Sequence, residues 1–353
     1  MRVLATGALC CLILVCSHGD PIHACTSFCM ETPDGPVFGT NLDLTISGDG
    51  LVFVNQRGIA KAGWQESTTG EIARWTSEYG SVTFNLAGRE FAWGGMNEAG
   101  LTVSSMELVA GDYPEPDERP PVAIALWVQY VLDTCATVRE VIGVDSLVRV
   151  RDVPVTSHYL VADADGNCAV VEFVDGRTLV YTGEDLPVEA LANCEYGPAL
   201  RYVEEGVLPE DNPGESAERV AGAGARSDNY DAGRDTSAVD YAFETLTEVV
   251  RAPHTKWSVV FDIPKREVWF RSAASPMIKH LSLHSFDLSC EAPLLMLDVN
   301  AVRRGDVDEY FEPYDRDVNE NIFDTFCGRY GIEISEGAGA VLTEHFDTFE
   351  CAP

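Results

Sequence analysis

The chain has 353 residues, of which 46% are hydrophobic and 23% are charged. This composition is typical of a folded protein that buries one large core or two modest ones. The 57 acidic residues outnumber the 24 basic ones and give a formal net charge of -33. Nucleic acids and anionic membranes bind clustered lysine and arginine, so the charge argues against both as partners. The acidic residues are spread along the chain, as on a solvated surface, and form no calcium loop of the D-x-D-x-D-G type.

The N-terminus has the pattern of a secretory leader. One arginine precedes an apolar run of about fourteen residues, which is too short to span a bilayer. Ala24, with Ile22 two positions earlier, is acceptable to a signal peptidase. The alternative is a lipoprotein signal, because "IHAC" loosely matches a lipobox, but a lipobox adjoins the apolar run and here "SHGDPIHA" intervenes. We predict a signal peptide over residues 1–24, export to the periplasm or the medium, no membrane contact after cleavage, and Cys25 as the first mature residue.

Residues 25–109 contain short β-like runs that are separated by Gly, Asn, Asp and Thr at hairpin spacing. A proline-rich loop follows at residues 112–121. The apolar pattern then predicts a helix over 122–135 and a second, short helix over 137–144. The first third of the chain therefore indicates consecutive antiparallel strands followed by two helices.

Strands are predicted again over 157–183, where "DADGN" and "VDGR" supply turn residues between β-rich runs. The Gly-rich and acidic segment 205–237 indicates loops around a short helix. A helix over 237–250 and a hairpin over 256–272 follow, and the last fifty residues predict two or three helical pieces. This order is typical of an α+β protein with antiparallel sheets covered by helices.

Removal of the leader leaves eight cysteines, which allow up to four disulfides in an oxidising compartment. If Cys25 stays free, at most three bridges form and a second thiol is left over. Cys25 and Cys29 cannot pair within a strand, because four residues at about 3.3 Å each separate their Cα atoms by roughly 13 Å, against a limit of about 7 Å. No pair of cysteines has the C-x-x-C spacing of zinc sites, so we predict no metal and no cofactor.

A cysteine at the mature N-terminus can supply a nucleophile and a base together. A thiol has a pKa near 8.5 and an α-amino group has one near 7.7 to 8.0, so the amine can accept the thiol proton with little mismatch. Before cleavage the same nitrogen is an amide without basicity, which makes processing the activating step. The alternative is that Cys25 follows the leader by accident or is a disulfide partner.

The chain contains, in order, "CTSF" with "DGPVFGTNLDL", "NQRG", "GMNEAGL", "SHYLVADADGNCAVVEF", "LANCEYG" and "TKWSVVFDIPKREVWFRS". In order and spacing these stretches resemble the choloylglycine hydrolases, a family of N-terminal nucleophile hydrolases that includes bile salt hydrolases and penicillin V acylases. The resemblance implies a four-layer αββα sandwich whose first strand places Cys25 between two sheets. We predict a catalytic domain over residues 25–301 and an acidic, partly helical extension over 302–353.

The resemblance also implies roles for four residues. Cys25 matches the nucleophile, and Asp43 in "NLDL" matches an aspartate that orients the α-amine and stabilises the ammonium. Asn193 in "LAN" matches an uncharged donor to the tetrahedral oxyanion. The second oxyanion position falls on Glu107, where the main-chain N–H would donate. Its carboxylate would repel an oxyanion, so we expect that side chain to point elsewhere.

The chain departs from the family pattern at two arginines. Thr40 stands where bile salt hydrolases carry an arginine three residues before the aspartate, although isopenicillin N acyltransferase relatives tolerate this change. In "RSDNY", Asn229 takes the place of a later arginine, and Arg226 lies three residues earlier. If Arg226 turns toward the thiolate, positive charge is kept there; otherwise the cysteine pKa is less depressed. His158 is interpreted as a strand residue, because an α-amine already fills the role of base.

The resemblance favours an exported N-terminal cysteine amidohydrolase that cleaves a small-molecule N-acyl amide through a thioester. Two alternatives stay open: an acyltransferase that uses the same cysteine, and a secreted binding protein in which Cys25 is paired or lipidated. Penicillin V, conjugated bile acids and acyl-homoserine lactones all fit as substrates, although the acidic surface disfavours anionic bile salts. Relatives are often tetramers, and the C-terminal extension could serve assembly of a homo-oligomer.

Overall fold

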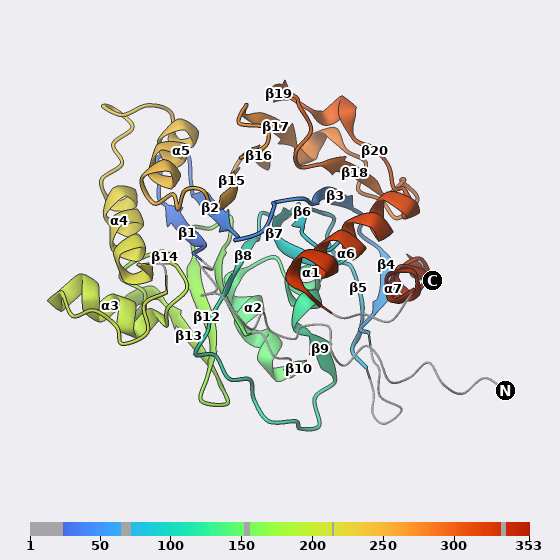
Figure 1. Ribbon diagram of the computed structural model, residues 1–353, viewed down its shortest axis with the longest axis horizontal. Coiled ribbons are helices and arrows are strands. Elements are labelled where there is room, and N and C mark those ends of the chain that lie inside the picture. Colours follow the sequence, from blue (N-terminus) through green and yellow to red (C-terminus); the bar gives the residue numbers. More distant parts are fainter. Residues whose placement is uncertain (1–23, 65–71, 152–155, 214, 333–336) are drawn as a thin grey trace.

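The computed structural model describes residues 24–64, 72–151, 156–213, 215–332 and 337–353. Apart from Ala24, the predicted signal peptide lies outside these residues. Two large sheets are stacked at the centre, and helices lie on their two outer faces (Figure 1). The predicted four-layer αββα sandwich is confirmed.

The first sheet includes the strand that follows Cys25. Among the described residues it has seven strands, antiparallel except for its last pair. In spatial order they are β14 (Ala190–Leu191), β1 (Thr26–Met30), β2 (Val37–Asp43), β15 (Thr255–Asp262), β16 (Glu267–Ser272), β17 (Lys279–Ser282) and β19 (Gly305–Asp306).

The second sheet faces the first and has nine antiparallel strands within the described ranges. Their spatial order is β13 (Arg177–Thr182), β12 (Cys168–Val174), β11 (Ser157–Ala162), β8 (Thr102–Glu107), β7 (Ala92–Asn97), β6 (Ser81–Asn85), β3 (Leu51–Asn55), β18 (Leu295–Asp298) and β20 (Glu312–Pro313). Two small sheets lie outside it and consist of β9 (Pro121–Ala123) with β10 (Arg149–Arg151), and of β21 (Glu350–Cys351), β4 (Ile59–Ala62) and β5 (Arg74–Thr76).

The helices form the two outer layers (Figure 1). The seven-stranded sheet is covered by α3 (Tyr196–Glu205), α4 (Ser216–Asp228) and α5 (Ala238–Glu248). The nine-stranded sheet is covered by α1 (Ile124–Thr134), α2 (Val138–Gly143), α6 (Arg316–Tyr330) and α7 (Ala338–Phe346). Single 3₁₀ turns lie at Val144–Ser146, Gly183–Asp185, Leu283–Ser285 and Asp308–Tyr310. None of the helices in the described parts of the chain is long and apolar enough to cross a membrane.

Strand β1 is buried along its whole length. Because strand side chains alternate between the two faces, Cys25 and Cys29 pack between the sheets, whereas Phe28 and Met30 pack under the helices. Gly39 of β2 lies opposite Phe28, and a Cβ at Gly39 would collide with the Phe28 ring. The glycine therefore lets an aromatic ring close the outer face of β1 while the two cysteines stay inside.

The helical layer beside β1 is longer than predicted. Segment 205–237 contains the 13-residue helix α4 instead of a short helix between loops, and α3 precedes it. The sequence of α4 is rich in Gly and Ala, and Gly has weak helix propensity. Ala217, Ala223 and Gly224 are nevertheless buried, and a Cβ at Gly224 would meet Val188. Close packing therefore stabilises a helix that local preference alone disfavours.

Residues 302–353 are joined to both sheets. β19 and β20 lie at sheet edges, and the two predicted helical pieces are α6 and α7. The final strand β21 pairs with β4, and a disulfide joins Cys351 to Cys290. Among the described cysteines this is the one disulfide, and the other six thiols are free and buried.

Candidate active site

Cys25 lies directly before β1, and its side chain is 5% exposed. The ladder pairs Thr26 with Asn41, which brings Cys25 beside the end of β2. The main-chain N–H of Asp43 donates to Sγ of Cys25 at 3.4 Å, and the thiol lies 3.8 Å from the Asp43 carbonyl oxygen. With Ala24 attached, burial raises the pKa of the thiol to about 12; the Asp43 carboxylate adds to this rise and Arg219 opposes it. The thiol is therefore protonated at neutral pH in the unprocessed chain.

The carboxylate of Asp43 is fully buried next to this thiol. Neither of its oxygens makes a well-formed hydrogen bond within the described part of the chain, although Thr255 lies close enough to lower its pKa. Burial is the larger effect and raises the pKa of Asp43 to about 6. A buried carboxylate without a donor is costly, so this position is suited to a cationic partner.

Arg219 of α4 is the arginine beside Cys25. Its guanidinium contacts the carbonyl oxygens of Ala24 and Cys25 and donates to Oγ1 of Thr26 at 2.6 Å. It also reaches Oδ1 of Asn193 at 3.3 Å. Burial lowers the pKa of Arg219 to about 10, so it is still a cation at neutral pH. This side chain connects the start of β1 with the segment that carries Asn193.

Asn193 follows β14 and is buried. Its Nδ2 donates to the main-chain carbonyl of Glu107 at 2.8 Å, and its own N–H donates to Oγ of Ser216. With Oδ1 held by Arg219, the amide has one fixed orientation. One N–H of the side-chain NH₂ is used by Glu107, which leaves the second for a ligand.

Glu107 is the last residue of β8, and its carbonyl oxygen contacts Asn193. The N–H of Leu108 donates to Thr156 across the ladder to β11. Because ladder bonds alternate along an antiparallel strand, the N–H of Glu107 points away from β11. Its role as an oxyanion donor stays a prediction. Its carboxylate raises the pKa of Cys25 slightly, as the weakest of the main influences.

The structure places Arg226 and Asn229 away from Cys25. Arg226 forms ion pairs with Glu248 at 2.9 Å and Glu244 at 3.5 Å on the outer side of α5. The exposed Asn229 ends α4 and donates to the carbonyl of Ala225. Neither residue contacts Cys25, because both belong to the C-terminal turn of the helix.

Sequence reasoning missed Arg219, although the pattern of α4 contains a signal for it. Arg219 lies on the same helix face as the buried Ser216, Val220, Ala223 and Ser227. An arginine on a buried helix face requires a polar partner, and this one finds it at Cys25. Arg226 lies two turns further along the same helix face, so only its position along the helix axis separates it from Arg219.

Thr40 takes the place of the first family arginine, and it adds no charge to the site. Its hydroxyl lies 2.8 Å from that of Ser27 on β1 and 2.9 Å from that of Ser104 on β8. These three hydroxyls connect the two sheets near Cys25 without adding charge. Positive charge at the site therefore comes from α4 and not from β2.

A cavity of about 320 Å³ begins at Asn193. Its apolar lining consists of Leu108, Ala110, Pro198, Val207, Leu208 and Pro209. Arg201 and three acidic residues, Glu195, Glu210 and Asp211, also line it. The apolar walls can hold an acyl chain.

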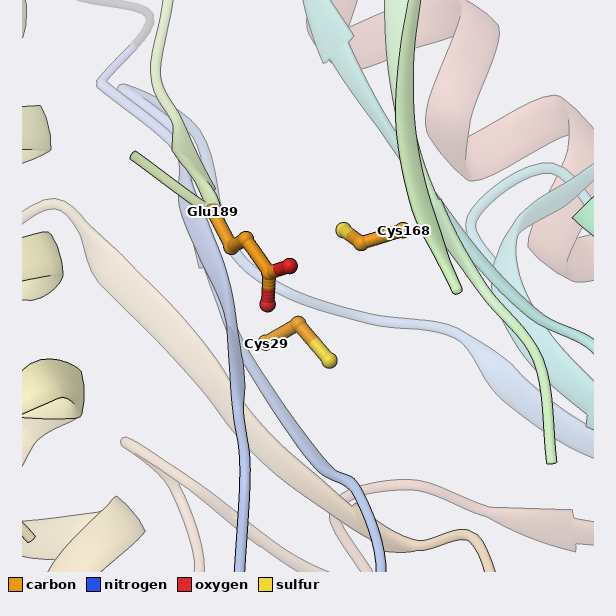
Figure 2. A group of neighbouring side chains, drawn as sticks. All are labelled: Cys29, Cys168 and Glu189. Carbon is orange, nitrogen blue, oxygen red and sulfur yellow. The ribbon is translucent and has the colours of Figure 1, made fainter. Parts of the chain in front are cut away.

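Figure 2 shows a second group of thiol and carboxylate side chains: Cys29, Cys168 and Glu189. Cys29 of β1 and Glu189, just before β14, are neighbours through a main-chain hydrogen bond, and Cys168 comes from the facing sheet. The two sulfurs and a carboxylate oxygen lie within 4.8 Å of one another. These are ligand types that zinc accepts. Cysteine spacing cannot predict the group, because three separate segments form it.

Asp43→Asn is expected to stabilise the protein that keeps Ala24 before Cys25, and to do so only at high pH. Well below pH 3.8, the ordinary pKa of the group, the carboxyl is protonated in both the folded and the unfolded chain. Between that value and the folded pKa of about 6, the unfolded chain releases the proton while the folded chain keeps it, so the cost of burying this group grows with pH and reaches its full size above about pH 6. The gain at pH 8 is up to about 3 kcal/mol, measured by urea denaturation at pH 4 and pH 8.

Asp262→Asn is the matched control, because the buried Asp262 is paired with Lys265 at 2.6 Å. It should give no gain at pH 8. Equal stability of the parent and Asp43→Asn proteins at pH 8 would contradict the assignment of an uncompensated carboxylate.

Comparison with known proteins identifies the family to which the chain is similar. Residues 25–193 match the model of the linear amide C–N hydrolases, choloylglycine hydrolase family. A penicillin V acylase of Pectobacterium atrosepticum is 25% identical over 316 residues, which cover 75% of this chain and 82% of that protein.

Solved structures share the fold. The penicillin V acylase from Agrobacterium tumefaciens aligns with a TM-score of 0.70 and 24% identity, over 82% of this chain and 98% of the other. A variant of the conjugated bile acid hydrolase from Clostridium perfringens aligns with a TM-score of 0.63 and 16% identity, over 77% and 96%. The family match and the shared αββα sandwich place the chain in the choloylglycine hydrolase family of linear amide C–N hydrolases.

Proposed function

We propose that the chain is an exported amidohydrolase in which Cys25, as the mature N-terminal residue, is the nucleophile. The thiolate attacks the carbonyl carbon of an N-acyl amide, and Asn193 with a main-chain N–H at Glu107 holds the oxyanion. The α-ammonium of Cys25 gives its proton to the leaving amine, and the C–N bond breaks to leave a thioester. Water, deprotonated by the same amine, then releases the carboxylic acid and the thiol.

The observation that carries this proposal is the buried carboxylate of Asp43, which lacks a hydrogen-bond donor among the described residues. Cleavage of the Ala24–Cys25 bond would create an ammonium group beside it. An adjacent cation lowers the pKa of a carboxylate and of a thiol, so both groups would ionise more readily. Before cleavage the nitrogen of Cys25 is an uncharged amide, and the thiol has a pKa of about 12.

The cavity at Asn193 and the names of similar proteins support a proposal for the substrate class. Its apolar walls suit an apolar acyl group, and similar proteins are named penicillin V acylase. We therefore propose an N-acyl amide with an apolar acyl part and use penicillin V as the probe. Adding an amine acceptor and analysing the products would distinguish hydrolysis from acyl transfer.

Export is part of the same proposal. The leader pattern supports it, as does the disulfide between Cys290 and Cys351, because such bonds persist in oxidising compartments.

The decisive experiment is the mass and N-terminal sequence of the protein recovered outside the cytoplasm. We expect a chain that begins at Cys25 with a free amine and hydrolyses penicillin V. A mature chain that begins before Cys25, or one that carries lipid on it, would exclude the mechanism, because an amide or acylated nitrogen cannot act as the base.

A further inference from the structure

His158 and Glu172 form a buried pair that faces the seven-stranded sheet. They lie opposite each other on β11 and β12, and both are fully buried. Nδ1 of His158 is 2.8 Å from Oε1 of Glu172. Leu160 and Val170, two residues further along the same faces of these strands, pack in the core between the sheets. The pair therefore points across the sandwich, toward β14 and the residues after it.

The pair contacts the main chain on both sides of Asn193. Nε2 of His158 faces the carbonyl oxygen of Ala192, the residue before it. Oε1 of Glu172 accepts a hydrogen bond from the N–H of Tyr196 at 2.9 Å, three residues after it. The short connection between β14 and α3 is thus held at both ends by one pair of side chains.

The Glu172 carboxylate caps the N-terminus of helix α3. The first N–H groups of a helix lack partners within the helix, and the N-cap residue Glu195 makes no side-chain hydrogen bond to them. Glu172 supplies the missing acceptor from another strand, and a carboxylate is favourable at this end of a helix dipole. The contact fixes the start of α3 relative to the nine-stranded sheet.

We propose that His158 and Glu172 are positioning residues that hold the Asn193 amide at the oxyanion site. The inference rests on the oxyanion role given to Asn193 in the proposed function. The ring nitrogens of His158 face Glu172 and Ala192 and not Cys25, so the imidazole is not the base. The pair acts on the reaction through the main chain of the Asn193 segment. A displacement of about 1 Å at such a donor can cost about 10²-fold in rate.

A double-mutant cycle with Asn193→Ala tests this coupling. In the mature enzyme, His158→Gln and Glu172→Gln should each lower kcat for penicillin V about 10- to 100-fold, with KM changed less than about 2-fold. In the Asn193→Ala background the same changes should lower kcat less than about 2-fold, because the donor they position is gone. Hydrogen exchange at the Tyr196 amide should also be faster in Glu172→Gln.

The possible outcomes separate the two proposals. Equal losses with and without Asn193 would overturn the positioning role while leaving the proposed function standing. An Asn193→Ala enzyme with unchanged kcat would instead overturn the oxyanion assignment, and the positioning role with it. Glu172→Gln is isosteric and gives the same test if His158→Gln fails to fold.

Glu90→Gln is the matched control for removing a buried charge. Glu90 pairs with Lys61 at 2.9 Å, and both side chains are buried. This variant should unfold at lower denaturant concentration but keep its kcat. A loss of kcat as large as that of Glu172→Gln would show that any destabilised variant loses activity and would overturn the specific role.

Discussion

Cys25→Ala is expected to abolish hydrolysis of penicillin V by the mature protein, with a loss in kcat of about 10⁴- to 10⁶-fold. Removing the nucleophile of a covalent hydrolase has an effect of this size, because the remaining groups can only bind and polarise the amide. The rate is measured as release of the free amine and the phenoxyacetic acid. During turnover the parent protein should gain the mass of the bound acyl group, and the Cys25→Ala protein should not.

The control for this change is Cys327→Ala. Cys327 is a buried, free thiol on α6, on the outer side of the nine-stranded sheet. It should lose some stability to the smaller side chain and keep its kcat. Residual activity of Cys25→Ala within about 10-fold of the parent would rule out covalent catalysis at this position.

Arg219→Met is expected to lower kcat by about 10²-fold and the free energy of unfolding by about 2 to 4 kcal/mol. The change leaves Asn193 and Thr26 without a donor they now have. It also removes a cation that lowers the pKa of Cys25 and Asp43. Both pKa values therefore rise, and the acidic limb of the pH–rate profile should move to higher pH.

Arg226→Met provides the comparison on the same helix. Its ion pairs with Glu244 and Glu248 are exposed, and such pairs contribute about 0 to 1 kcal/mol. Its kcat and pH–rate profile should match those of the parent. If Arg226→Met shifts the profile and Arg219→Met does not, the arginine beside the thiol has been wrongly identified.

Most of the fold could be predicted from local patterns. Turn residues between β-rich runs indicated β11, β12 and β13, and the apolar pattern of 122–135 indicated α1 (Ile124–Thr134). The helix α4 could not be predicted in the same way, because its glycines have weak helix propensity and the helix is stabilised by packing against the layer below. Local preference and tertiary packing disagree there, and packing decides.

The candidate site also contains residues that short motifs predict and residues that only tertiary packing reveals. Cys25, Asp43 and Asn193 belong to short motifs, and the structure brings Cys25 next to both Asp43 and the Arg219 that holds Asn193. The choice between Arg219 and Arg226 depends on which turn of a helix faces a strand, which motif spacing does not encode. The contacts of His158 are equally long-range, because a strand residue becomes a support for Asn193 only through the stacking of two sheets.

The contact between Arg219 and the carbonyl oxygen of Ala24 spans 195 residues of sequence. A ribosome that adds about 5 to 20 residues per second therefore needs about 10 to 40 seconds to reach Arg219 after Ala24. During that interval the strands and the helix that bury Ala24 in the folded chain are incomplete. If the proposed cleavage before Cys25 occurs, the peptidase therefore has about 10 to 40 seconds to act before the folding step that buries Ala24.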